Sequence, residues 1–349
     1  MKALVVDGKQ ARLDSHRRIP ELRDDSILVR PMAIALNPTD WKHVVYGRAK
    51  DNCIIGCDYA GVVEAVGKAV TKSWSLGDRI FGCGHGSNYC NIDDGVFAEY
   101  AMVKGDLQMR MPDNLSFEKA ATVGLGAITV GQGLYQKAMK LRLPTDSTEK
   151  NGIPVLIYGG ASATGALAIQ YAKLSGYTVI TTCSPKNFDY VKQLGADAAF
   201  DYSEPNIGTK IRDYTGNQMK YAWDTISSDA SAQICAAALS STESGLKYGT
   251  LVPVESPRND VETISTVMYT VFGKAFKFGD RQLPASHDDF EFGKIFFDVT
   301  EKLLAEGRLK THTERVGRDG LQGALEGLQE MQAGRVRGEK LVYRLAETP

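Results

Sequence analysis

The run from Pro154 to Val254 constrains the fold most, because short apolar segments alternate there with helical ones. PVLIYGG, YTVITTC, ADAAFDY, KYAWDTI and GTLVPV have the composition of strands, and a segment with helical patterning follows each of the first four. Parallel strands need long crossover connections, which helices usually supply. The run therefore predicts a doubly wound α/β domain with five parallel strands.

The first of these strands ends in a glycine-rich turn, YGGASATG, from Tyr158 to Gly165. Small residues at such a turn let the backbone approach a pyrophosphate, which meets free N–H groups at the start of the following helix. The turn departs from G-x-G-x-x-G, because Ser162 stands at the middle glycine position, where its hydroxyl could donate to a phosphate. The alternative is a tight strand–helix turn that binds no ligand.

The second strand ends in Cys183-Ser184-Pro185-Lys186-Asn187, where an NAD site usually has an acidic residue. One cation and two neutral polar side chains suit the 2′-phosphate of NADPH instead. Tyr202, at the end of the third strand, could lie near the adenine or the phosphate. The alternatives are that Asn187 caps a helix beside a solvated Lys186 and that Tyr202 has a packing role.

The rest of the chain has a different pattern of predicted secondary structure. Residues 1 to about 115 contain short strands separated by turn residues, which predicts a small barrel-like β-domain. Near the end we expect helices at Phe290–Glu306 and Asp319–Ala333, and a final strand, KLVYRL. The polar segment Pro144–Gly152 is expected to be a surface insertion.

Charge and hydropathy exclude several classes of protein. The chain has 41 Lys and Arg against 42 Asp and Glu, a net charge of −1. It therefore lacks the surplus of basic residues that is typical of nucleic-acid-binding proteins. Its apolar runs are shorter than the roughly 20 residues that cross a bilayer, and its first residues do not resemble a signal peptide. We expect a cytoplasmic protein that binds neither nucleic acid nor membrane.

Potential metal ligands gather in one stretch that contains Cys53, Cys57, Cys83, His85 and Cys90. A structural zinc site needs four ligands, usually in two closely spaced pairs. Cys53 and Cys57 have the wrong spacing, and the other three lie in a single loop. The sequence therefore predicts no metal site.

Several segments together resemble the medium-chain dehydrogenase/reductase superfamily over nearly the whole chain: GCDYAGVVEAVG, LGDRIFG, GVFAEYAMV, GGASATG and GEKLVYRL. Zinc-dependent members carry Cys at the position of Asn37 and Gly-His-Glu where Gly56-Cys57-Asp58 stands. The chain is thus similar to the zinc-independent branch of quinone and enoyl reductases. NPTD at Asn37, YGGASATG, TCSPKNF, FDY and the insertion before Pro154 are similar to fungal trans-acting enoyl reductases of polyketide synthases, the lovastatin-type group.

This resemblance implies a GroES-like β-barrel catalytic domain at 1–124, a Rossmann NADPH-binding domain at 125–265, and a return segment at 266–349 that completes the catalytic domain. It places the nicotinamide in a cleft between the domains. The cofactor contacts that it implies are Thr39, Asp40, Trp41, Lys42, Ala161, Ser162, Ala163, Thr164, Ser184, Pro185, Lys186, Asn187, Tyr202, Pro253, Val254, Val342 and Tyr343. The substrate contacts that it implies are Thr122, Val123, Gly124, Leu125, Gly126, Ala127, Ile128 and Thr129, with Val271, Phe272, Gly273 and Lys274 closing the site.

The implied chemistry is reduction of an enone or enoyl thioester. Hydride transfer to the β-carbon leaves an enolate, whose oxygen must be stabilised and whose α-carbon must receive a proton. Lys42 and Thr129 are candidates for positioning groups, and solvent could supply the proton. The substrate would be a small molecule or a carrier-bound enoyl group, with a polyketide synthase as a possible partner. Two alternatives remain: a quinone oxidoreductase that acts on small free substrates, and a redox-silent homologue with a cyclase or isomerase task.

Overall fold

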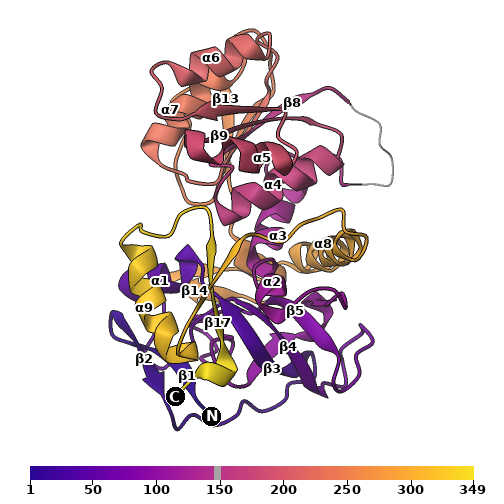
Figure 1. Cartoon of the computed structure of the whole chain (residues 1–349), viewed down its shortest axis with the longest axis vertical. Helices are drawn as coiled ribbons and strands as arrows, with labels where there is room; N and C mark the ends of the chain where they lie inside the picture. The colour runs from indigo at the N-terminus through magenta and orange to yellow at the C-terminus, as the bar shows by residue number, and fades with distance from the viewer. Residues whose placement is uncertain (145–150) are drawn as a thin grey trace. The chain divides into compact units, whose positions relative to one another are not determined.

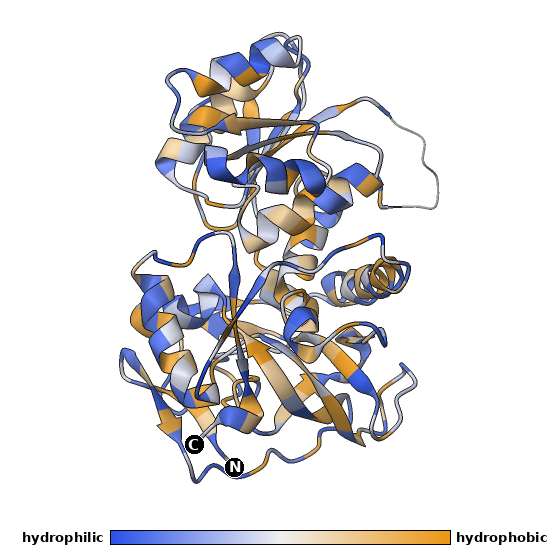
Figure 2. Ribbon diagram, in the orientation of Figure 1, coloured by the Kyte–Doolittle hydropathy of each residue, from blue (hydrophilic) through white to orange (hydrophobic). Residues whose placement is uncertain are grey.

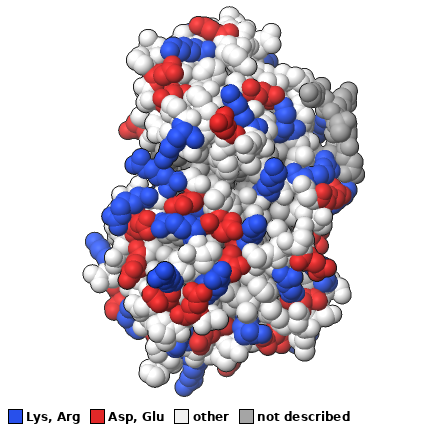
Figure 3. All heavy atoms as spheres, in the orientation of Figure 1, with Lys and Arg blue, Asp and Glu red and all other residues white. Residues whose placement is uncertain are grey.

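The computed structural model describes residues 1–144 and 151–349, which form two compact units (Figure 1). The first unit combines Met1–Leu125 with Tyr269–Pro349, and the second is Gly126–Met268. The predicted surface insertion lies mostly outside the described residues. Acidic and basic side chains are mixed over the face in Figure 3, as the near-zero net charge leads us to expect.

The second unit is built on a parallel sheet in the order β10-β9-β8-β11-β12-β13. Its strands are β8 (Pro154–Tyr158), β9 (Thr178–Cys183), β10 (Ala198–Asp201), β11 (Tyr221–Asp224), β12 (Leu246–Thr250) and β13 (Val261–Ser265). The doubly wound fold is thus confirmed, with one strand more than predicted. β12 also begins three residues before the predicted GTLVPV segment, because pairing with β11 fixes its register.

Helices cover both faces of this sheet: α4 (Ala163–Leu174), α5 (Phe188–Gln193), α6 (Ile207–Tyr214) and α7 (Asp229–Ala238). α4 and α5 lie over one face, whereas α6 and α7 pack against each other over the opposite face (Figure 1). The strands between them are largely apolar (Figure 2). Buried side chains such as Leu156, Ile180 and Tyr248 form the core of the unit.

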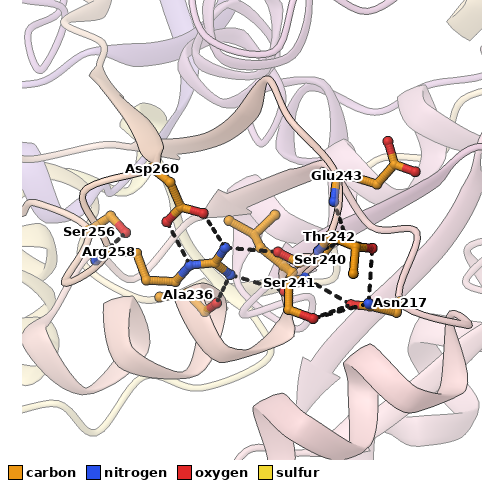
Figure 4. A network of polar contacts seen from close by, with 10 residues as sticks. Asn217, Ala236, Ser240, Ser241, Thr242, Glu243, Ser256, Arg258 and Asp260 are labelled. Carbon is orange, nitrogen blue, oxygen red and sulfur yellow. Dashed lines mark hydrogen bonds and ion pairs between the residues drawn. The ribbon is translucent and has the colours of Figure 1, made fainter.

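The strand that sequence patterning missed, β13, is anchored by Arg258 (Figure 4). The guanidinium donates to the carbonyls of Ala236 at 3.0 Å, Leu239 at 3.2 Å and Ser240 at 2.8 Å, at the C-terminal end of α7. Asp260 holds it through two hydrogen bonds. A cation suits the unpaired carbonyls at a helix C-terminus. This contact fixes the segment that leads into the edge strand.

The first unit contains a sheet in the order β16-β17-β3-β4-β5-β7, with β6 paired to β3. Its strands are β3 (Ser26–Ala35), β4 (Asp58–Val66), β5 (Arg79–Cys83), β6 (Ala101–Lys104), β7 (Gln108–Arg110), β16 (Glu314–Gly317) and β17 (Lys340–Arg344). β17 pairs antiparallel with β3, Val342 opposite Ala35. The predicted C-terminal strand is therefore confirmed, and it joins the N-terminal sheet.

Two hairpins and several helices complete this unit. The hairpins pair β1 (Ala3–Asp7) with β2 (Gln10–Asp14), and β14 (Phe276–Phe278) with β15 (Arg281–Leu283). The helices are α1 (Pro38–Val45), α2 (Phe117–Ala120), α8 (His287–Ala305) and α9 (Gly320–Gln332), and α3 (Gly124–Val130) crosses the boundary between the units. Among the described residues, every helix is too short or too polar to span a membrane.

Candidate active site and cofactor site

The glycine-rich turn between β8 and α4 packs its backbone tightly against its neighbours. Gly159 has a left-handed φ of 81°, which glycine adopts without steric cost. A Cβ at Gly160 would lie 2.1 Å from Thr181 Oγ1, and one at Gly165 would lie 2.3 Å from the carbonyl oxygen of Gly159. The turn therefore presents bare backbone in front of a helix N-terminus, the arrangement that suits a pyrophosphate.

Ser162 is the N-cap of α4. Its Oγ accepts a hydrogen bond from Gly165 N at 2.9 Å and lies 2.9 Å from Thr225 Oγ1. Thr225 donates its own proton to the carbonyl of Tyr158 at 2.8 Å, so Ser162 is the donor in the contact between the two hydroxyls. The hydroxyl that we expected to contact a phosphate is thus already engaged within the protein. An anion would instead meet the free N–H groups of the first helical turn.

Thr225 was not among the cofactor contacts expected from the sequence, although its place directly after β11 could have indicated it. β8 and β11 are parallel neighbours, with Asp224 opposite Tyr158, so the residues that follow the two strands lie side by side. The connections from β8 and β11 lead to opposite sides of the sheet, which makes this pair the topological switch point. Ligands of open α/β sheets bind at that point, beyond the carboxyl ends of the strands.

The proposed 2′-phosphate residues gather at the ends of β9 and β10. Cys183 lies opposite Asp201 in the sheet. Ser184 and Tyr202, the residues that follow them, are in contact, with Ser184 Oγ 3.1 Å from the Tyr202 hydroxyl. Tyr202 is 44% exposed. Lys186 is also exposed, and no carboxylate of residues 1–144 or 151–349 pairs with it. The sheet register thus brings together two positions that the sequence suggested separately, and Lys186 follows Ser184 by two residues.

In the first unit, α1 carries Thr39, Asp40, Trp41 and Lys42. Asp40 Oδ2 accepts a hydrogen bond from the backbone N–H of Asn37 at 2.7 Å, which closes the N-terminus of the helix. Burial raises the pKa of Asp40 to about 7, against the effect of that hydrogen bond. Asp40 is therefore a buried carboxyl group that caps the N-terminus of α1.

Asp58, at the start of β4, accepts hydrogen bonds from three directions. Leu125 N donates to Oδ1 at 2.6 Å, and Asn37 Nδ2 donates to Oδ2 at 2.9 Å. The Lys340 ammonium forms an ion pair with Oδ2 and also donates to the carbonyl of Thr122 at 3.2 Å. The sequence did not indicate this pairing: Asp58 stood out only as a departure from a zinc-ligand pattern, and Lys340 only as the first residue of the expected C-terminal strand.

Tyr269 connects Thr39 and Cys57 to a group of aromatic rings. Its hydroxyl lies 2.7 Å from Thr39 Oγ1 and 3.4 Å from Cys57 Sγ. His85 stacks on the Tyr269 ring at a centroid distance of 4.5 Å, and His43 meets it edge-on at 5.3 Å. Burial lowers the pKa of His43 to about 4 and that of His85 to about 3. Both rings are therefore neutral at pH 7 and poor sources of a proton.

Of the two proposed catalytic residues, Lys42 lies in the first unit and Thr129 in the second. Lys42 is half-buried, and burial, together with the nearby Arg48, lowers its pKa. Its Nζ lies 5.7 Å from the centre of the Trp41 ring. Lys42 is thus a partly desolvated ammonium, which is a stronger hydrogen-bond donor than a fully hydrated one.

The remaining predicted residues occupy varied positions. Val342 and Tyr343 are buried in β17, whereas Pro253 and Val254 follow β12 in a loop. The predicted closing segment begins in the 3₁₀ helix Met268–Phe272. Phe272 and Lys274 line a cavity of about 200 Å³ together with His85.

The comparisons with known proteins agree with the fold of the two units. The alcohol dehydrogenase GroES-like domain matches residues 23–113, and the zinc-binding dehydrogenase domain matches residues 163–271. The trans-enoyl reductase resD of Aspergillus sclerotiorum is 44% identical over 99% of this chain and 100% of its own length. The trans-enoyl reductase TOXD of Cochliobolus carbonum is 52% identical over 79% of this chain and 91% of its own. A Pseudomonas syringae quinone oxidoreductase structure shares the fold, with a TM-score of 0.75 and 22% identity over 98% of this chain and 99% of that one.

The residues at the metal-ligand positions of zinc-dependent relatives do not fit a zinc ion. The Asn37 side chain donates through Nδ2 to Asp58, and an amide N–H is no metal ligand. Burial raises the pKa of the Cys57 thiol well above its usual value, and Asp40 raises it further, whereas zinc binds a thiolate. Among the described residues, no three His, Cys, Asp or Glu side chains form a group that could hold a metal.

Proposed function

Because this chain belongs to the trans-enoyl reductases of the medium-chain dehydrogenase/reductase superfamily, we propose that it reduces the carbon–carbon double bond of an α,β-unsaturated thioester with NADPH. The observation that carries this proposal is the polar cluster of Asn37, Cys57 and Asp58 at the positions of zinc ligands, in a chain that keeps a nucleotide-binding turn. Such a chain must stabilise the enolate oxygen with its own hydrogen-bond donors.

The cofactor assignment rests on the second unit. The bare backbone of the turn and the N-terminus of α4 suit the pyrophosphate, and Ala161, Ala163 and Thr164 flank that position. Lys186, with Ser184, Asn187 and Tyr202, is assigned to the 2′-phosphate. NADPH supplies the hydride when it is bound. The other cofactor contacts suggested by the family resemblance, including Thr39 and Val342, remain part of the proposal.

Lys42 and Thr129 are assigned to orient the substrate carbonyl. The partly desolvated Lys42 ammonium suits an oxygen that gains negative charge, because a hydrogen bond from a cation strengthens as the acceptor becomes anionic. Neutral His43 and His85 do not compete as acids at pH 7, so solvent is assigned as the proton source for the α-carbon. The run Thr122–Thr129 and the segment Val271–Lys274 are assigned to the substrate.

The proposed partner is a polyketide synthase that presents the enoyl group on its carrier domain. The relatives named trans-enoyl reductases cover nearly this whole chain, which favours the same role here. We assign the catalytic domain to residues 1–124 and 266–349, and the cofactor domain to residues 125–265. The expected location is the cytoplasm.

The test is an NADPH-oxidation assay at 340 nm with an enoyl thioester and a quinone side by side. We expect turnover of the thioester with a kcat/KM at least tenfold above that of the quinone. The saturated acyl thioester should appear as product by mass spectrometry. A preference for the quinone, or tight NADPH binding without oxidation by either acceptor, would contradict the proposal.

A further inference from the structure

A fully buried ion pair lies in the first unit, and neither of its residues is assigned to contact the substrate or the cofactor. Asp58 and Lys340 are 0% and 2% exposed and are separated by 282 residues in sequence. Burial of two charges costs much of what their attraction returns, so such pairs are weak contributors to stability compared with apolar residues. Their best-attested use is to specify one arrangement of the elements that they join.

The pair holds both ends of one short segment. Asp58 Oδ1 accepts from Leu125 N at 2.6 Å, while the Lys340 ammonium donates to the carbonyl of Thr122 at 3.2 Å. Gly124, between these contacts, packs so closely that a Cβ there would lie 2.9 Å from Asp58 Oδ1 and 2.2 Å from Gly82 O. The segment is thus seated on the carboxylate, and it leads directly into α3.

The second oxygen of the same carboxylate holds another element. Asn37 Nδ2 donates to Asp58 Oδ2 at 2.9 Å, and Asn37 is the N-cap of α1, the helix that carries Lys42. One carboxylate therefore fixes the start of α1 and the start of α3. Lys340 supplies the counter-charge that a buried carboxylate requires.

We infer that Asp58 and Lys340 are positioning residues, which set the helix that carries Lys42 against the substrate-side segment Thr122–Leu125. This inference rests on the proposed enoyl-thioester reduction. Small displacements of groups that orient a substrate can cost about 100-fold in rate. Loss of the pair should therefore reduce kcat even where the fold survives.

The central variant is the double substitution Asp58→Asn/Lys340→Met, which removes both charges and leaves no unpaired one. We expect its Tm to fall less than that of Lys340→Met alone, because it leaves no buried charge unpaired. Its asparagine still accepts from Leu125 N, but it presents an N–H to Asn37 and the ammonium contact with Thr122 is gone. We expect kcat for an enoyl thioester to fall at least 20-fold, with the Kd for NADPH unchanged.

The matched controls are single variants. Arg344→Met, on the same strand, removes an exposed ion pair with Glu118 and should leave Tm and kcat near the wild-type values. Lys340→Met alone leaves the buried Asp58 carboxylate without a counter-ion and should lower Tm strongly. A double variant with wild-type Tm and wild-type kcat would overturn the inference, and so would a Lys340→Met variant that is indistinguishable from wild type.

Hydrogen exchange provides a measurement that does not depend on turnover. In the wild type, the Leu125 amide should exchange as slowly as the paired amides of β4, and it should exchange at least tenfold faster in the double variant. If the double variant fails to fold, rapid exchange of Leu125 in the wild type overturns the inference and slow exchange supports it. If the wild type reduces no enoyl thioester, the proposed function fails, whereas the exchange result still decides the positioning role.

Discussion

Replacement of Lys186 tests how this chain distinguishes NADPH from NADH. The 2′-phosphate carries close to two negative charges at pH 7, and NADH lacks it. Lys186 is exposed and has no carboxylate partner among the described residues, so Lys186→Ala removes a charge without stranding another. One charge-assisted contact at a solvent-exposed site is worth ~1–2 kcal/mol, which corresponds to roughly a 5–30-fold change in affinity.

The assay is fluorescence titration of both cofactors against the wild type and the variant. We expect the Kd for NADPH to rise by that factor in Lys186→Ala, with little change for NADH, and the difference should shrink as salt is added. Lys192→Ala, an exposed lysine on α5, serves as the matched control and should leave both constants unchanged. Equal losses for the two cofactors would refute the phosphate assignment, and tighter binding of NADH than NADPH by the wild type would refute the choice of cofactor.

Three further perturbations follow from the geometry. Gly165→Ala places a Cβ 2.3 Å from a backbone oxygen, so we expect a lower Tm and at least tenfold weaker NADPH binding, and an unchanged Kd would contradict the role of the turn. Arg258→Ala leaves three carbonyls at the end of α7 without their donor and should cost about 2 kcal/mol in urea unfolding; a loss below about 0.5 kcal/mol would contradict it. The pKa of Asp40 is raised to about 7, so the native state holds a proton that the unfolded state loses near pH 4. As the pH rises from 4 to 7, the free energy of unfolding should therefore fall by up to ~4 kcal/mol relative to Asp40→Asn. Parallel pH profiles of the two proteins over that range would contradict the shift.

Much of the second unit could be predicted from the sequence because its signals are local. The apolar segment before Gly159, the small residues of the turn and the mostly apolar stretch after Ser162 fix a strand, a tight turn and a capped helix within about 20 residues. The ends of β9 and β10 became neighbours once the strands were recognised, because parallel pairing aligns their carboxyl ends. β13 escaped prediction, since its five residues carry little pattern and Arg258 secures its approach through contacts with a distant helix.

The polar centre of the first unit was decided by tertiary structure. The sequence identified Asn37 and Cys57 as departures from a zinc-ligand pattern, but it did not indicate what replaces the metal. Asp58 finds its counter-ion on a strand 282 residues away, and the Tyr269 hydroxyl reaches Thr39 across 230 residues. Hydrophobic periodicity and turn chemistry act over a few residues and so can be read along the chain. A lone buried polar group requires a partner, yet only the folded chain determines which distant residue supplies it.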